Sequence, residues 1–149
     1  VYKGTVSYNT DKYQEHHVRW WDCVDVISSS GYYPLNDWEN QLNRIEKVVK
    51  AFDKPFFFAE TGCMSTEGSP MVPNDWTMQG ACDPKGQADW YRAMFEACAK
   101  RDWVSGMALW SWTDQLYAKN EAMSRSDYEI FAKPSELVVA EYYGRYKKN

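Results

Sequence analysis

The sequence predicts an α/β fold in which four parallel strands alternate with helices. Four short segments consist mostly of apolar residues, which is typical of strands that are buried on both faces of a parallel sheet. The longer stretches between them repeat apolar residues at the spacing of an amphipathic helix. In order, the 149 residues read as strand, short helix, strand, helix, strand, helix, strand and helix. One domain of four β/α units, spanning residues 1–149, is therefore expected.

The predicted strands are brief and mostly apolar. They are residues 4–8, 24–30, 56–59 and 104–110. The second is rich in Val, Ile and Ser. Pro55 restricts the backbone of Lys54, which prevents any preceding helix from continuing into the third strand.

Amphipathic helices are expected between and after these strands. Asn36 or Asp37 can cap the first, and Pro134 suits the first turn of the last, which begins near Lys133. The first helix carries Trp38, Leu42, Ile45, Val48, Val49 and Phe52. The second carries Ala88, Tyr91, Met94, Phe95 and Cys98, and the last carries Leu137, Val138, Ala140 and Tyr143.

Two irregular stretches follow the third and fourth strands, at residues 62–86 and 111–126. A loop as long as the first is usually functional or disordered in a compact domain. Parallel β/α folds gather their sites at the carboxyl ends of the strands. Both loops are therefore expected to open on the same face and to border a functional site.

Charge and motif content exclude several classes of partner. The formal net charge is −4, and no basic stripe or Arg-rich arm occurs, so nucleic acid is not an expected partner. The longest apolar runs fall far short of the roughly 20 residues that span a bilayer, so no membrane partner is expected. No G-x-G-x-x-G or Walker-type loop supports nucleotide binding.

The aromatic content points toward carbohydrate. Trp, Tyr and Phe make up 17% of the residues, and a core alone seldom needs so many Trp and Tyr. Flat amphipathic rings favour stacking on a sugar. Any single ring could instead be an ordinary core or rim residue, so only the total favours this interpretation.

The four cysteines do not form a zinc-binding pattern, because no C-x-x-C pair occurs. Cys23 and Cys98 fall inside apolar segments and are expected to be buried thiols. Cys63 and Cys82 flank one long loop, and a disulfide between them is possible if the protein is exported. The chain begins with Val1, which suggests a processed, truncated or excised piece.

Glu60 ends the third predicted strand, in a segment that reads as fully buried. A buried carboxylate is costly unless it is hydrogen-bonded or used, and strand ends in β/α barrels hold catalytic carboxylates at the barrel mouth. By itself Glu60 could also be a structural carboxylate. The neighbouring strands offer a phenol at Tyr32, which could hydrogen-bond a carboxylate one strand away, and an indole platform at Trp110.

These segments resemble strands five to eight of a clan A glycoside hydrolase, and the likeness is to family 113, the β-mannanase type. The motifs are DVISSSGYYP (25–34), KPFFFAETG (54–62), GMALWSW (106–112) and YEIFAKP (128–134). The resemblance implies that the chain is the C-terminal half of a TIM (β/α)8 barrel. It also implies that Glu60 is the catalytic nucleophile, that Tyr32 or Tyr33 hydrogen-bonds it, and that Trp110 lies under the reacting sugar.

The resemblance also implies that something is missing. Retaining glycosidases need a second carboxylate, and in this clan it comes from an Asn-Glu pair at the end of strand four. No such strand precedes Gly4. Asp75, Glu67 and Asp114 are acidic loop residues, but each is more simply a solvated or substrate-contacting side chain. The expected partner is an N-terminal half-barrel, or a second copy of this chain, because a complete barrel takes about 250 residues.

The expected function is that of a retaining β-glycoside hydrolase acting on a β-linked plant polysaccharide, with mannan as the first candidate. Tyr33, Trp76 and Trp112 are further candidates for substrate binding, and no cofactor is expected. Secretion is expected for an enzyme of polymers, although a cytoplasmic enzyme of short oligosaccharides fits the same pattern.

Two other functions remain open at this point. A non-catalytic carbohydrate-binding or structural half-barrel would keep the aromatic platforms without turnover. A metal-dependent enzyme using His16, His17 and Asp22 is a weaker alternative, because adjacent histidines on a helix point in different directions.

Overall fold

Four parallel strands form the centre of the molecule. The computed structural model describes residues 2–146, in which the strands are β1 (Ser7–Thr10), β2 (Val26–Ser30), β3 (Phe56–Thr61) and β4 (Val104–Leu109). They lie in the order β1-β2-β3-β4, and each neighbouring pair is parallel. Parallel strands in consecutive order are the arrangement from which a β/α barrel is built.

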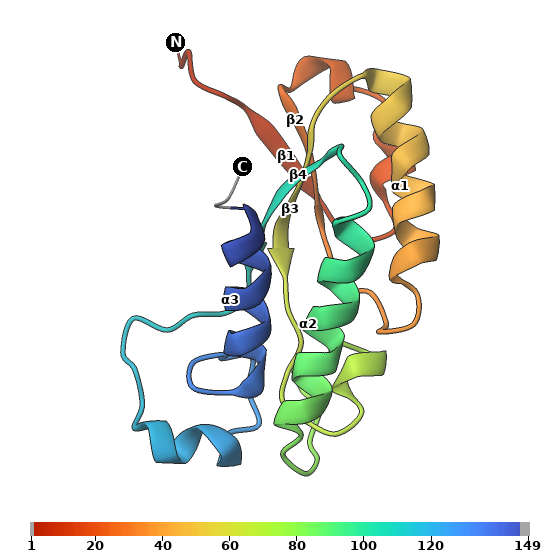
Figure 1. Cartoon of the computed structure of the whole chain (residues 1–149). Coiled ribbons are helices and arrows are strands. Elements are labelled where there is room, and N and C mark those ends of the chain that lie inside the picture. The colour runs from red at the N-terminus through yellow and green to blue at the C-terminus, as the bar shows by residue number, and fades with distance from the viewer. Residues whose placement is uncertain (1, 147–149) are drawn as a thin grey trace.

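Three α-helices pack side by side along one face of this sheet (Figure 1). They are α1 (Trp38–Phe52), α2 (Pro84–Cys98) and α3 (Pro134–Tyr146). Short 3-10 helices complete the chain, at η1 (Glu15–His17), η2 (Trp21–Cys23), η3 (Ser69–Met71) and η4 (Lys119–Ser124). The helix expected after the first strand is thus split in two. Within residues 2–146, no helix is long and apolar enough to cross a membrane.

The boundaries of all four strands differ from those that the sequence predicted, most of them by one or two residues. The first strand runs over Ser7–Thr10 and not 4–8, because these are the residues that pair with β2 in register. Helix α2 begins before its first predicted apolar residue. Its cap is the Asp83 carboxylate, which accepts a hydrogen bond of 2.8 Å from the backbone N–H of Gly86, and Pro84 occupies the first turn.

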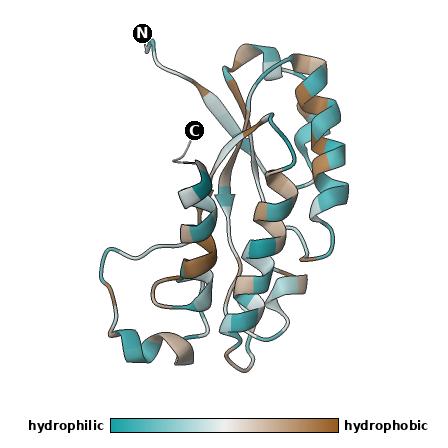
Figure 2. Cartoon of the chain, viewed as in Figure 1, coloured by the Kyte–Doolittle hydropathy of each residue, from teal (hydrophilic) through white to brown (hydrophobic). Residues whose placement is uncertain are grey.

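The core lies between the sheet and the helices. Ile27 of β2 and Phe58 of β3 belong to this core and are fully buried. The Trp38 ring of α1 meets the rings of Phe58 and Trp90 edge to face, with centroids 5.6 and 5.4 Å apart. In Figure 2, α1 shows alternating apolar and polar residues, as expected of an amphipathic helix that covers this core.

On β1 and β2, the opposite face of the sheet carries small polar side chains. The hydroxyls of Ser7 and Ser28 hydrogen-bond each other across β1 and β2, and Asn9 Nδ2 donates to Ser30 Oγ at 3.3 Å. Within residues 2–146, β1 and β4 each have a partner strand on one side only. The sheet therefore does not close on itself, and both edges present backbone groups to which further strands could bond.

A buried carboxylate ties the segment after β1 to the rest of the fold. Glu15 has no exposed surface, and its Oε1 accepts hydrogen bonds from Ser29 Oγ at 2.6 Å and from Tyr33 Oη at 2.8 Å. Its Oε2 lies 2.6 Å from Arg44 Nη1 of α1. One side chain therefore joins η1, β2, the residues after β2 and α1.

We expect Glu15→Ala to destabilise the fold by about 3 kcal/mol, because it leaves the buried Tyr33 hydroxyl without its acceptor and the partly buried Arg44 guanidinium without its ion-pair partner. The free energy of unfolding from urea titrations, followed by tryptophan fluorescence, measures this loss. Glu46→Ala is the control, since Glu46 pairs with Lys50 on the surface of α1 and its loss should leave stability unchanged. Equal effects of the two substitutions would contradict the structural role of Glu15.

Candidate active site

Glu60 lies near the carboxyl end of β3, and its carboxylate is hydrogen-bonded to Ser30 at the end of β2 and to Tyr32 just beyond it. An irregularity in the β2–β3 register at Ser29 and Ser30 pairs Ser30 with Glu60. The Ser30 hydroxyl donates to Glu60 Oε1 at 3.2 Å, and Tyr32 also hydrogen-bonds this carboxylate. The half-buried carboxylate thus has a hydroxyl and a phenol as partners and keeps part of its surface open.

Tyr32 is the hydrogen-bond donor to Glu60 in this arrangement. Burial raises the pKa of its phenol well above the usual range, and the negative charge of Glu60 and the hydrogen bond to it raise that pKa further. The phenol therefore stays protonated at neutral pH and directs its O–H toward the carboxylate.

Trp110 follows β4 and is brought next to Glu60 by close packing of two backbones. The backbone N–H of Trp110 donates to the carbonyl oxygen of Thr61 at 2.7 Å. A Cβ atom at Gly62 would lie only 2.0 Å from the Trp110 carbonyl oxygen, so no other residue fits there without moving the chain. The indole itself is 51% exposed. Its ring is therefore available to a ligand beside Glu60.

These residues line one hollow of about 260 Å³ at the carboxyl end of the sheet. Its walls are Tyr32, Glu60, Asn74, Trp76, Trp110 and Tyr128. The structure thus brings together four of the residues singled out in the sequence, namely Glu60, Tyr32, Trp76 and Trp110. It adds Asn74 and Tyr128, which no local sequence signal marked as site residues.

Two other candidates lie outside this hollow. Tyr33 points to the helix side of the sheet, where it is fully buried and donates to Glu15, because successive residues alternate between the two faces. Trp112 does not line the hollow, and its ring packs edge to face on Phe131 with centroids 5.8 Å apart. Of the two tyrosines offered as partners of Glu60, the structure therefore places Tyr32 in contact with it.

The loop acids are not part of the hollow. Asp75 accepts hydrogen bonds from the backbone N–H and hydroxyl of Thr77, while Glu67 and Asp114 are exposed, and none of the three lines the hollow. Within the described part of the chain, no group of three His, Cys, Asp or Glu side chains could hold a metal ion.

The cysteines are all free thiols. Cys63 is buried and contacts Ser69 Oγ at 3.4 Å, whereas Cys82 Sγ donates to the carbonyl oxygens of Met123 and Arg125. The possible disulfide between Cys63 and Cys82 is thus not formed. Cys98 is buried as expected, but Cys23 is exposed, because it ends the surface helix η2 instead of entering a strand.

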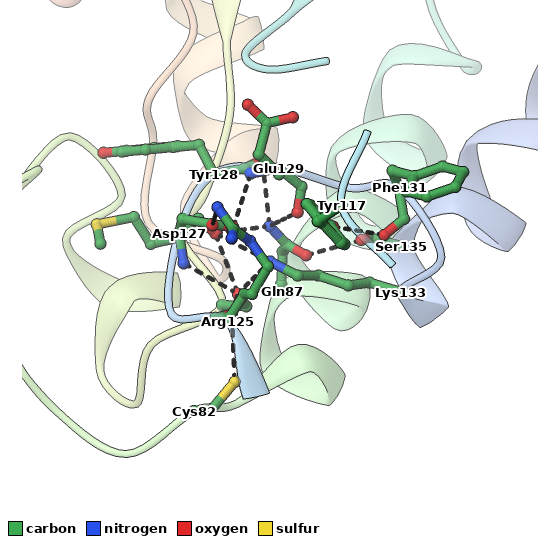
Figure 3. Close-up of polar contacts among 12 residues, drawn as sticks. Cys82, Gln87, Tyr117, Arg125, Asp127, Tyr128, Glu129, Phe131, Lys133 and Ser135 are labelled. Atoms are coloured by element: carbon green, nitrogen blue, oxygen red, sulfur yellow. Dashed lines mark hydrogen bonds and ion pairs between the residues drawn. The ribbon is translucent and has the colours of Figure 1, made fainter. Parts of the chain in front are cut away.

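An ion pair between the buried Lys133 and the partly exposed Asp127 fixes the loop that carries Tyr128 (Figure 3). Lys133 Nζ lies 2.6 Å from Asp127 Oδ1 and donates to Ser65 Oγ at 2.7 Å, so it joins this loop to the one after β3. Burial lowers the pKa of Lys133, and the hydrogen bond and charge of Asp127 act against that shift. Gln87 of α2 donates to the Cys63 carbonyl oxygen at 2.8 Å and accepts a hydrogen bond from Ser135 Oγ at 2.7 Å.

This anchoring sets the position of Tyr128 in the hollow. The Tyr128 hydroxyl donates to the carbonyl oxygen of Pro73 at 2.7 Å, and its ring meets that of Tyr32 edge to face. Burial raises the pKa of Tyr128 to about 12, with further contributions from nearby acidic groups that include Glu60. Tyr128 therefore links the loops after β3 and β4 at the site.

Glu129 fixes the start of the loop after β4. Its carboxylate accepts hydrogen bonds from Ser111 Oγ and from the backbone N–H of Thr113, both at 2.7 Å. Tyr91 of α2 also donates to the carbonyl oxygen of Trp110, at 3.2 Å. The backbone on both sides of the Trp110 indole is thus held by hydrogen bonds.

The sequence profile of Glycoside Hydrolase Family 113 matches residues 1–133. A solved GH113 β-1,4-mannanase is similar over 96% of this chain, with a TM-score of 0.93 and 55% identity. A GH113 β-mannanase from Alicyclobacillus acidocaldarius is similar over the same share, with a TM-score of 0.90 and 40% identity. The chain spans 46% of the length of each of these two structures.

A more distant likeness concerns the fold alone. A β-glucuronidase from Ruminococcus gnavus matches 96% of this chain and 26% of its own, with a TM-score of 0.62 and 16% identity. A comparison with curated proteins found no match. The family match, the β-mannanase neighbours and the order of parallel strands agree with one another. The chain belongs to Glycoside Hydrolase Family 113 and forms the C-terminal half of a TIM barrel.

Proposed function

We propose that this chain supplies the catalytic nucleophile of a retaining β-mannanase. The observation that carries the proposal is the hollow in which Glu60, bonded to Tyr32, faces the exposed indole of Trp110. A rigidly held carboxylate beside an aromatic platform matches what attack on a sugar ring requires. The names of the two similar GH113 structures make β-1,4-linked mannan the first substrate to test.

Five of the six residues that line the hollow have a part in this mechanism. Glu60 attacks the anomeric carbon, the glycosidic oxygen leaves with a proton from an acid, and water later releases the sugar from Glu60. Tyr32 keeps the carboxylate oriented by its hydrogen bond. Trp110 stacks on the sugar at the point of cleavage, and the exposed Trp76 and the Asn74 amide extend the binding surface along the chain.

The acid must come from outside the described residues. Glu60 is the single carboxylate among the residues that line the hollow. Retaining glycosidases place the second carboxyl group about 5–5.5 Å from the first. We therefore propose that an N-terminal half-barrel, pairing with the open edges at β1 and β4, provides the acid/base residue, and that a second copy of this chain does not.

The same absence of a second carboxylate supports one other function for the isolated chain. On its own, the half-barrel would bind carbohydrate through Trp110 and Trp76 without cleaving it. The two functions differ in whether turnover appears once the missing half is supplied.

The first test is completion of the barrel. Here the completed barrel means these residues joined to the N-terminal half of the 55% identical β-1,4-mannanase. We expect it to hydrolyse β-1,4-mannan with retention of anomeric configuration, and we expect the isolated chain to show no turnover. Glu60→Gln should lower kcat by at least about a thousandfold, because the amide cannot act as the nucleophile, whereas Glu67→Gln should leave it unchanged.

Reducing-sugar release and NMR of the first-formed anomer measure these outcomes. Turnover by the isolated chain as a monomer would show that a second carboxylate lies within it. Activity of the Glu60→Gln barrel would contradict the assignment of the nucleophile.

The second test concerns the aromatic platform. We expect Trp110→Ala in the completed barrel to lower kcat/KM for mannopentaose by about ten- to a hundredfold, because the sugar loses its stacking surface. Trp112→Ala is the matched control. The two rings lie in the same segment with 51% and 53% of their surface exposed, but Trp112 is outside the hollow. An equal loss in both variants would contradict the special role of Trp110.

A further inference from the structure

We infer that Asn9 and Ser30 form a hydrogen-bond relay that orients Glu60 for attack. This inference rests on the proposed nucleophilic role of Glu60 and adds two positioning residues to it. Neither residue was marked by the sequence, since each is a small polar side chain on a strand.

The relay crosses three neighbouring strands. Asn9 Nδ2 of β1 donates to Ser30 Oγ of β2 at 3.3 Å, and Ser30 Oγ donates to Glu60 Oε1 of β3 at 3.2 Å. The β2–β3 register shifts between Ser29 and Ser30, which brings Ser30 directly opposite Glu60. All three side chains lie on the sheet face opposite the helices.

The order of donors gives the relay a direction. A serine hydroxyl has one proton and two lone pairs, while an ionised carboxylate can only accept. When the Asn9 amide occupies a lone pair of Ser30, the Ser30 proton is left for Glu60. Asn9 therefore acts through Ser30 and holds the hydroxyl in its donating orientation.

The two partners of Glu60 restrain its carboxylate from neighbouring positions. Ser30 contacts Oε1 from the last residue of β2, and Tyr32 bonds the same carboxylate from two residues further along. A carboxylate held in this way cannot rotate freely about its terminal bond. Its attacking oxygen therefore stays directed at one point, and such orientation lowers the barrier without tightening substrate binding.

The sheet contains a matched control for this relay. Ser28 lies two positions before Ser30 on the same face, and its hydroxyl also hydrogen-bonds a side chain of β1, that of Ser7. Both serines are buried. Ser28 has no contact with Glu60 among the hydrogen bonds of the described residues, so the two positions differ mainly in the relay.

The experiment compares Ser30→Ala, Ser28→Ala and Ser30→Thr in the completed barrel. The substrate is 2,4-dinitrophenyl β-mannobioside, whose leaving group departs without help from an acid, so the initial burst of dinitrophenolate reports attack by the nucleophile. We expect Ser30→Ala to slow the burst by about ten- to a hundredfold with KM changed less than about twofold. Ser28→Ala should change the burst less than about twofold, and Ser30→Thr, which keeps a hydroxyl, should recover at least half of the lost rate.

A double-mutant cycle tests the link to Asn9. We expect Asn9→Ala alone to slow the burst about three- to tenfold, and to have less than a twofold effect when Ser30 is already Ala, because its only route to Glu60 is gone. Additive effects of the two substitutions would overturn the relay. Equal losses for Ser30→Ala and Ser28→Ala, or a loss that appears in KM alone, would overturn it as well.

These results separate the relay from the proposed function. If Glu60→Gln abolishes the burst while Ser30→Ala behaves like Ser28→Ala, the nucleophile stands and the relay is wrong. If Glu60→Gln retains the burst, the proposed function fails, and the relay fails with it.

Discussion

The close approach of two backbones at Gly62 determines where Glu60 and Trp110 lie in this half-barrel. A side chain at this position would overlap the carbonyl oxygen of Trp110. The carbonyl oxygen of Thr61, the residue before Gly62, accepts a hydrogen bond from the backbone N–H of Trp110. Because Glu60 lies only two residues before Gly62, the same contact that joins the ends of β3 and β4 places the carboxylate beside the indole. The remaining features of the site support this arrangement.

Two buried charges hold the parts of the fold that apolar packing does not reach. Glu15 joins the segment after β1 to β2 and α1, and Lys133 joins the loops after β3 and β4. Buried ionic groups of this kind contribute little net stability, but removing one partner is costly. Lys133 fixes the loops that border the hollow, whereas the sheet itself stays open at both edges.

Much of this structure could be predicted from the sequence, because its signals are local. Apolar runs and helical spacing gave the order of strands and helices, and the end of the third strand gave Glu60. Contacts across strands have no local signal. The orientation of Tyr33 depends on the alternation of side chains between the two faces beyond the end of β2. The contacts of Asn9, Ser30 and Tyr128 depend on strand register and on loops that meet in space. The shifted first strand has the same cause, since pairing with β2 decides its limits.

The proposed mechanism requires Glu60 to be the residue that bonds to the sugar. The most direct measurement is mass spectrometry of the completed barrel after reaction with 2-deoxy-2-fluoro-β-mannosyl fluoride, which slows release of a glycosyl-enzyme intermediate. We predict that one fluorosugar accumulates and that peptide fragmentation places it on the Glu60 carboxylate, with release on transfer to an acceptor sugar. A label on another residue, or inversion of configuration without any covalent adduct, would contradict the assignment of Glu60 as the nucleophile.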